Sequence, residues 1–271
     1  MQWFDALGTP HAPYPGVPRI VSLVPSLTEL LVDLGLAGAL VGRTGFCVHP
    51  RDVVRRIPKV GGTKGFDLAR VRSLAPTHVI VNIDENRRDE VAALREFVPH
   101  LIVTHPLAPR DNLDLYRLFG GVFGREGEAA ILCAGFEREW AALAELAGGL
   151  PRQKVLYLIW EMPWMSVSRD TYIARMLAAA GWDSVPADAA QRYPVLELSQ
   201  VAGDADLLLL SSEPYPFREK HALALRADPA SAGKPVALID GEMVSWYGSR
   251  AVRGLAYLRK LRSAHGKSPG T

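Results

Sequence analysis

Cys47 and His49 are the residues whose types and spacing come closest to those of a metal site. A thiolate and an imidazole two residues apart can bind one metal ion when the backbone between them is extended. The sequence offers no clear third and fourth ligand, and Glu85, Glu161 and Glu213 are candidates by position alone. The pair therefore predicts either a metal ion held by Cys47 and His49, or a buried structural cysteine beside a loop histidine.

The sequence contains few motifs that are typical of enzymes. The sequence has no G-x-S-x-G, H-E-x-x-H or P-loop motif. Residues 61–65 have the wrong spacing for a phosphate loop, and they predict a turn. We therefore expect a protein without catalytic residues. The alternative is a metal-handling protein or enzyme that uses Cys47 and His49.

Aromatic side chains concentrate in segments that follow predicted strands. Such rings can stack on a large, flat ligand while their polar ends stay in water, or they can fill the core instead. The whole set favours the first interpretation, binding of a bulky ligand without turnover. The set contains Trp160, Trp164, Tyr193, Tyr215, Phe217, Trp246 and Tyr247.

Strands and helices alternate in the order that builds parallel sheets. In the first half, a strand over residues 19–24 is followed by Pro25 and by the S-x-x-E spacing of a capping box at Ser26 and Glu29, which opens a helix. Further strands are predicted at 40–42, 77–81 and 101–103, with helices at 67–74, 89–97 and 111–119. In the second half, strands are predicted at 154–159, 205–210 and 235–239, with helices at 171–180, 198–202 and 249–261.

Residues 126–146 separate these two similar halves. They contain no proline, and apolar residues recur there at helical spacing, which predicts one long helix. The predicted fold is therefore α/β, with an N-terminal lobe over 1–122, a linking helix over 123–149 and a C-terminal lobe over 150–271. Because ligands bind beyond the carboxyl ends of parallel strands, we expect a ligand cleft between the lobes.

Composition excludes several classes of protein. The net charge of +2 in 271 residues excludes a globally basic surface for nucleic acid, and two cysteines exclude a disulfide scaffold. No segment reaches the roughly 18 consecutive apolar residues of a membrane span. The first residues lack the pattern of a secretory signal, so we expect a cytoplasmic protein, or a periplasmic or extracytoplasmic one if a signal was removed.

Several motifs carry a resemblance to a known family. Residues 19–30 (RIVSLVPSLTEL), Val60-Gly61-Gly62, Asp67-Leu68 and Leu74-Ala75-Pro76 resemble the cobalamin-type (class III) substrate-binding proteins of ABC importers. These belong to the helical-backbone metal-receptor, or TroA-like, group, which also includes siderophore and heme binders. The resemblance covers about residues 19–262. It implies two Rossmann-like lobes bridged by one long α-helix. It also implies a corrinoid such as cobalamin, or another metal chelate, as the ligand in the cleft, for uptake or intracellular carriage.

The resemblance also suggests positions for the ligand contacts. Stacking residues of the family fall near 46–50, 160–165 and Tyr193, and acidic and basic contacts fall at Glu242 and Arg250. Lys64 departs from the family, which often has an aromatic residue there. Together with the strand-end loops, this predicts a set of ligand-binding residues: Pro25, Phe46, Cys47, His49, Lys64, Trp160, Trp164, Tyr193, Tyr215, Glu242, Trp246 and Arg250.

The partner of the family is an ABC permease, which such proteins contact through one acidic residue on each lobe. The corresponding positions here are the uncharged Ala69 and Ser199, with Asp67 and Glu197 beside them. This departure favours a family member that does not serve an importer, such as a cytoplasmic corrinoid carrier or sensor. In a reducing cytoplasm, Cys47 as thiolate could ligate or reduce a bound metal centre.

Overall fold

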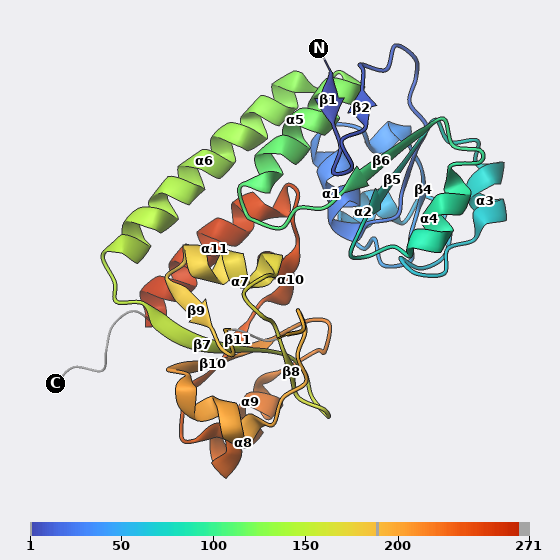
Figure 1. Ribbon diagram of the computed structural model, residues 1–271. Coiled ribbons are helices and arrows are strands. Elements are labelled where there is room, and N and C mark those ends of the chain that lie inside the picture. Colours follow the sequence, from blue (N-terminus) through green and yellow to red (C-terminus); the bar gives the residue numbers. More distant parts are fainter. Residues whose placement is uncertain (1, 188–189, 266–271) are drawn as a thin grey trace. The chain divides into compact units, whose positions relative to one another are not determined.

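The computed structural model describes residues 2–187 and 190–265, which form two compact units (Figure 1). Unit 1 comprises Met1–Pro106, Arg110–Gly135 and Tyr247–Arg250. Unit 2 comprises Leu107–Pro109, Phe136–Trp246 and Ala251–Thr271. The predicted lobe boundaries after residues 122 and 149 stay predictions.

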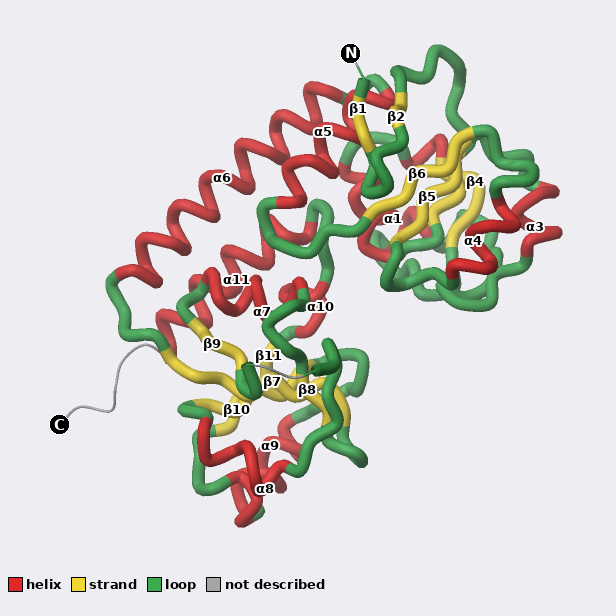
Figure 2. Tube along the Cα trace, in the orientation of Figure 1, coloured by secondary structure: helices red, strands yellow, loops and turns green. Residues whose placement is uncertain are grey.

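Unit 1 contains a four-stranded parallel sheet (Figure 2, yellow). Its strand order is β4 (Leu40–Arg43), β3 (Ile20–Ser22), β5 (His78–Asn82) and β6 (His100–Thr104). Apolar side chains from these strands form one core with residues of the flanking helices, which include Val71 and Leu94. The sheet forms because β-branched residues recur in the strands that the sequence predicts there.

Helices connect the strands of this sheet, and one more helix, α5 (Asp111–Phe123), follows its last strand. The connecting helices are α1 (Pro25–Asp33), α2 (Arg51–Val54), α3 (Leu68–Ser73) and α4 (Arg88–Leu94), with a short 3-10 turn, η1 (Ala37–Ala39). The predicted capping box at the start of α1 is wrong. The N-cap is Val24, which makes no side-chain cap, and Pro25 is the first helical residue. A proline suits that position because its missing N–H is not needed in the first turn.

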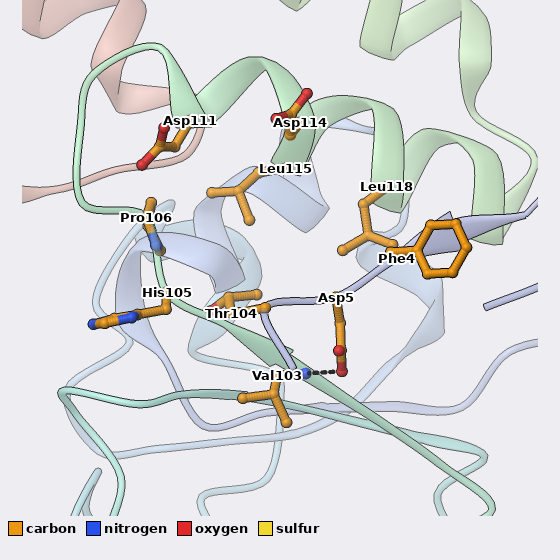
Figure 3. Close-up of a pocket in the computed structure, with 11 residues that line it drawn as sticks. Phe4, Asp5, Val103, Thr104, His105, Pro106, Asp111, Asp114, Leu115 and Leu118 are labelled. Atoms are coloured by element: carbon orange, nitrogen blue, oxygen red, sulfur yellow. Dashed lines mark hydrogen bonds between the residues drawn. The ribbon is translucent and has the colours of Figure 1, made fainter. Parts of the chain in front are cut away.

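An N-terminal hairpin precedes the first predicted strand and was not expected. Strands β1 (Trp3–Phe4) and β2 (Pro10–His11) pair antiparallel. The N–H of Ala6 donates to the carbonyl of Val103 at 2.9 Å. Asp5 Oδ2 accepts from the N–H of Val103 at 3.1 Å, the dashed line in Figure 3. Burial raises the pKa of Asp5, but hydrogen bonds from His11 and from backbone N–H groups lower it more, so it lies below its ordinary value.

A cavity of about 220 Å³ lies between this hairpin, the end of β6 and α5, and Figure 3 shows the residues that line it. Leu115 and Leu118 of α5 line it together with Phe4 and His105. Nε2 of His105 lies 3.4 Å from Oδ2 of Asp84, so the His105 ring has a carboxylate as its neighbour.

The long helix predicted between the two halves is present as α6 (Glu126–Gly148), a single helix of 23 residues. Gly124 ends α5 in the left-handed conformation, at φ 64°, which glycine adopts without strain. The boundary between the two units falls within α6, between Gly135 and Phe136.

Unit 2 contains a five-stranded sheet. Strands β11 (Val236–Ile239), β10 (Leu207–Ser211) and β7 (Gln153–Trp160) are parallel neighbours in that order. β9 (Trp182–Ser184) pairs parallel with the start of β7, and β8 (Met165–Ser166) pairs antiparallel with its end. The expected two-lobe α/β fold with parallel sheets is therefore confirmed, and the antiparallel β8 is an addition.

The remaining helices all contribute to unit 2. They are α7 (Tyr172–Ala179), α8 (Leu198–Val201), α9 (Glu219–Ala227), α10 (Gly241–Ser245) and α11 (Arg250–His265), with 3-10 turns η2 (Ala202–Asp204) and η3 (Pro229–Ser231). Thr171 caps α7 by accepting from the N–H of Ala174. None of the helices in the described part of the chain has both the length and the hydropathy of a membrane span.

Candidate functional site

Four predicted ligand residues of unit 1 closely follow its parallel strands in the sequence. Pro25 begins α1 three residues after β3, and Phe46, Cys47 and His49 lie between β4 and α2. Because the strands are parallel, their carboxyl ends lie at one edge of the sheet, where α/β proteins bind ligands.

Exposed apolar side chains mark this edge. Phe46 is 63% exposed, and Val48 and Ile83 of the neighbouring loops are also exposed. A methyl group at Gly62 would lie 3.6 Å from the Phe46 ring, so the ring lies against the turn that carries Lys64. The structure confirms a turn over residues 61–65, with Gly61 bridged to Phe66 and Lys64 exposed.

Cys47 differs from its neighbours because its side chain is completely buried. Thr28 Oγ1 donates to its sulfur at 3.0 Å, and Thr44 Oγ1 lies 3.2 Å from the same atom. Burial raises the pKa of the Cys47 thiol, which favours the protonated form over a thiolate. His49 is half-buried beside a cis peptide bond to Pro50. Among the described residues, no three His, Cys, Asp or Glu side chains come together as a metal site would require.

In unit 2, Tyr215 is the centre of an aromatic cluster at the ends of β7 and β10. Its ring lies 5.5 Å from that of Trp160 and 4.6 Å from that of Phe217. Its hydroxyl donates to Glu161 Oε2 at 2.8 Å. Trp160, which ends β7, is 40% exposed. The Trp160 ring is therefore exposed to solvent and packs against Tyr215, whose position is fixed by its hydrogen bond to Glu161.

Trp164 belongs to the core more than to the surface. Its ring stacks on buried Phe217, with centroids 6.0 Å apart and planes 7° apart, and it packs against the core of unit 2. Trp246 is half-buried after α10. The sequence placed the three tryptophans together in strand-end loops, but only Trp160 is an exposed ring.

Tyr193 lies in a segment that runs beside β8. Ser166 and Ser168 donate backbone N–H groups to the carbonyls of Pro194 and Arg192, at 3.1 and 2.9 Å. This pairing leaves Tyr193 42% exposed. Met162, in the loop between β7 and β8, is 85% exposed. The sequence did not indicate it, because only Glu161 and the two tryptophans of this segment have types that suggest a ligand contact.

The three carboxylates proposed by position as metal ligands each accept a hydrogen bond from a hydroxyl group. Glu161 accepts from Tyr215 and Glu213 accepts from Ser245. Glu85 accepts from Tyr247, whose burial raises its pKa well above the ordinary value. Burial also raises the pKa of Glu213. These carboxylates therefore help to position the strand-end loops of their own units.

The two charged contacts predicted near the last helix have different surroundings. Arg250 is buried and forms an ion pair with Glu29 of α1, with Nε 2.7 Å from Oε2. Glu242 is half-buried in the first turn of α10, where Asp240 accepts from its N–H at 3.1 Å. The ligand-binding roles of the twelve predicted residues stay predictions.

The positions compared with permease-contacting acids are also visible. Ala69 and Ser199 are both exposed. Asp67 caps α3 by accepting from the N–H of Arg70 at 3.0 Å, and Ser199 Oγ donates to Glu197 at 3.4 Å. Asp67 and Glu197 therefore each accept a hydrogen bond from a residue of the helix that they precede, α3 and α8.

Comparison with curated proteins gives relatives of one kind. The chain is 25% identical to the vitamin B12-binding protein of Vibrio parahaemolyticus over 202 residues, which cover 73% of this chain and 71% of the relative. It is 20% identical to the vitamin B12-binding protein of Vibrio vulnificus over 185 residues, which cover 68% of this chain and 67% of the relative.

Solved structures show the same fold. The periplasmic vitamin B12-binding protein BtuF of Vibrio cholerae has a TM-score of 0.81 at 17% identity, over 93% of this chain and 98% of that one. The periplasmic heme-binding protein RhuT of a Roseiflexus species, in its apo form, has a TM-score of 0.79 at 24% identity, over 93% of this chain and 100% of that one.

A family model described as periplasmic binding protein matches residues 20–231. This range contains the motif after β3, the parallel strands of unit 1, α6, and β7 and β10 of unit 2. The similar proteins share that organisation over most of their length. The chain is a member of the periplasmic binding protein family and, within it, of the class III substrate-binding proteins of ABC importers.

Proposed function

We propose that this chain binds a corrinoid, or a heme-like metal chelate, and releases it chemically unchanged. The observation that carries the proposal is the set of exposed rings at the carboxyl ends of the strands: Phe46 in unit 1, and Trp160 and Tyr193 in unit 2. Such rings leave apolar surface in contact with water, and they are suited to stacking on a flat ligand. Relatives described as vitamin B12-binding proteins support a corrinoid as the first ligand to test.

The alternative function, a metal-handling protein or enzyme based on Cys47 and His49, is not favoured. The Cys47 thiol is buried between two threonines, and its raised pKa disfavours the thiolate that metal binding needs. The matched family consists of binding proteins. Metal analysis of the purified protein would revive this alternative only if a stoichiometric metal ion disappeared in Cys47→Ala.

We further propose that the chain acts outside the cytoplasm and delivers its ligand to an ABC permease. The expected cytoplasmic location finds no support, since the matched family and its solved neighbours are described as periplasmic. Fractionation of the source cells tests this proposal. Recovery of the protein only with cytoplasmic markers would contradict it.

Ligand binding is tested by titrating the protein with cyanocobalamin, hemin and a ferric siderophore, with tryptophan fluorescence and calorimetry as readouts. We expect cyanocobalamin to quench Trp160 and to bind with a micromolar or lower Kd. Phe46→Ala should weaken binding about tenfold, because it removes one stacking surface. Phe4→Ala is the matched control, because Phe4 is 62% exposed but lies in the N-terminal hairpin.

The outcomes separate the ligand classes. Tight binding of hemin alone would replace the corrinoid by a heme as the ligand. Absence of binding by all three chelates, in calorimetry and in melting temperature, would overturn the proposed function. Native mass spectrometry of freshly purified protein gives an independent check, because a ligand that remains bound would appear as added mass.

A further inference from the structure

A cavity of about 530 Å³ in unit 1 contains none of the twelve residues predicted to bind the ligand. It lies between α4, the ends of β5 and β6, and the tip of the N-terminal hairpin at Leu7. This volume is in the range of small-molecule sites. The hairpin precedes the part of the chain that the family model matches, so one wall of the cavity comes from outside the family core.

The floor and the outer wall of the cavity are apolar. Val81 and Val103 are paired neighbours on β5 and β6, both buried, and they form the floor. Leu7 and Ile83 line the cavity as well and are 57% and 44% exposed. An apolar body placed here would contact the two buried valines and would shield Leu7 and Ile83 from water.

The inner wall is a single stripe of α4 with a distinct charge pattern. Arg88, Val91, Ala92 and Arg95 line the cavity, and their i, i+3, i+4, i+7 spacing places them on one face of the helix. Arg95 is the C-cap residue and keeps helical backbone angles. The stripe is therefore cationic at both ends and apolar in the middle.

The two guanidinium groups are the charged groups among the described residues that line this cavity. In the described part of the chain, neither Arg88 nor Arg95 makes a side-chain hydrogen bond or an ion pair, and no acidic residue is among the described residues that line the cavity. The two asparagines in the lining are already bonded. Asn86 Nδ2 donates to the carbonyl of Thr63 at 2.8 Å, and Asn82 Oδ1 accepts from the N–H of Asp84 at 2.8 Å.

We infer that this cavity binds an organic dianion with an apolar middle, and that Arg88 and Arg95 each hold one of its carboxylates. Guanidinium groups bind carboxylates through paired, charge-assisted hydrogen bonds. Seven helical residues separate the two arginines by about 10 Å, a length that a linear dicarboxylate of roughly eight to ten carbons also spans. The cavity shares Ile83 with the strand edge proposed to bind a corrinoid or heme, but neither arginine is among the twelve residues predicted to contact that ligand.

Calorimetry with suberate and sebacate tests the inference, with succinate, octanoate and octane-1,8-diol as comparison compounds. We expect the two longer dicarboxylates to bind more tightly than succinate, which is too short, and more tightly than octanoate, which has one carboxylate. The diol, which has no charge, should bind weakest. Affinity should fall as salt concentration rises, because both guanidinium groups are exposed.

Arg88→Gln and Arg95→Gln should each weaken suberate binding about tenfold, since each removes one charge-assisted contact. Arg87→Gln is the matched control, because Arg87 is an exposed arginine at the start of the same helix that does not line the cavity. The inference is overturned if suberate does not bind, if octanoate binds equally tightly, or if all three variants behave alike. Cyanocobalamin binding should be unchanged in the three variants.

Discussion

The guanidinium of Arg250 forms a two-point ion pair with the carboxylate of Glu29 inside unit 1. Nε lies 2.7 Å from Oε2 and Nη2 lies 2.9 Å from Oε1. The two side chains are only 5% and 4% exposed. The pair joins the first residue of α11 to α1, residues that are 221 positions apart in the sequence.

Arg250→Met should therefore lower the free energy of unfolding by about 3–5 kcal/mol, because it leaves the Glu29 carboxylate buried without its counter-charge. The urea midpoint measures this change. Arg117→Met, which removes an exposed pair with Asp114, is the control and should change stability by less than about 1 kcal/mol. An unchanged midpoint in Arg250→Met, together with lost ligand binding, would instead assign Arg250 to the ligand.

Trp164 and Trp160 should respond differently to replacement by alanine. Trp164→Ala should lower stability on the order of 2 kcal/mol, because its ring fills space against Phe217 and the core of unit 2. Trp160→Ala should leave the urea midpoint nearly unchanged and weaken chelate binding, since its ring is exposed. Equal losses of stability in the two variants would contradict this separation.

His78 makes stability depend on pH. Burial, together with the charges of the neighbouring His100 and His11, lowers its pKa to about 3. The ordinary pKa is 6.5, so between about pH 6.5 and pH 3 His78 is protonated in the unfolded chain and neutral in the folded chain. The stabilising contribution is complete above about pH 6.5 and is lost as pH falls toward 3.

His78→Phe should flatten the decline of the urea midpoint between pH 7 and pH 5. The ring of the substituted residue keeps the stacking on His100, which has a centroid distance of 4.7 Å in the native protein. Imidazole NMR signals of His78 should stay those of the neutral form down to about pH 4. A titration midpoint near 6.5 would show that the pKa of His78 is not lowered.

Gly121 allows the N-terminal hairpin to pack against α5. A Cβ atom at this position would overlap the indole ring of Trp3. Gly121→Ala should therefore displace the hairpin and speed proteolysis of the first residues. Gly127→Ala in α6 is the control, since a Cβ there meets nothing within 4 Å and alanine favours a helix. Identical cleavage rates for the two variants would show that Trp3 does not depend on Gly121.

Much of the fold could be predicted because its strands are continuous apolar runs. The segments that became β3, β5, β7 and β10 are buried on both faces, and such runs stand out in a sequence. The long helix α6 was likewise predicted from its helical periodicity. The strands β1 and β2 were missed because two residues each carry no periodic signal, and their pairing depends on contacts with β6 and α5.

The candidate site was only partly predictable. Strand-end loops could be located because they follow predicted strands, and exposed Phe46 and Trp160 do lie there. Sequence alone could not distinguish Trp160 from Trp164, because the difference lies in the contact with Phe217, a residue of a distant strand-end loop. The same limit applies to Ser26 and Glu29, where the spacing of a capping box was a coincidence and Glu29 pairs with Arg250.

The N-terminal hairpin has a consequence for solubility. The outer strand β6 would otherwise offer its free backbone groups to a second molecule, and unprotected strands of this kind promote aggregation by intermolecular pairing. Asp5 and Ala6 occupy the N–H and carbonyl of Val103, while Pro58 and Val60 bond to Arg43 of β4 on the opposite side of the sheet. Removal of the first 18 residues of the 271-residue chain should therefore lower the concentration at which the protein begins to oligomerise and precipitate, as light scattering would measure.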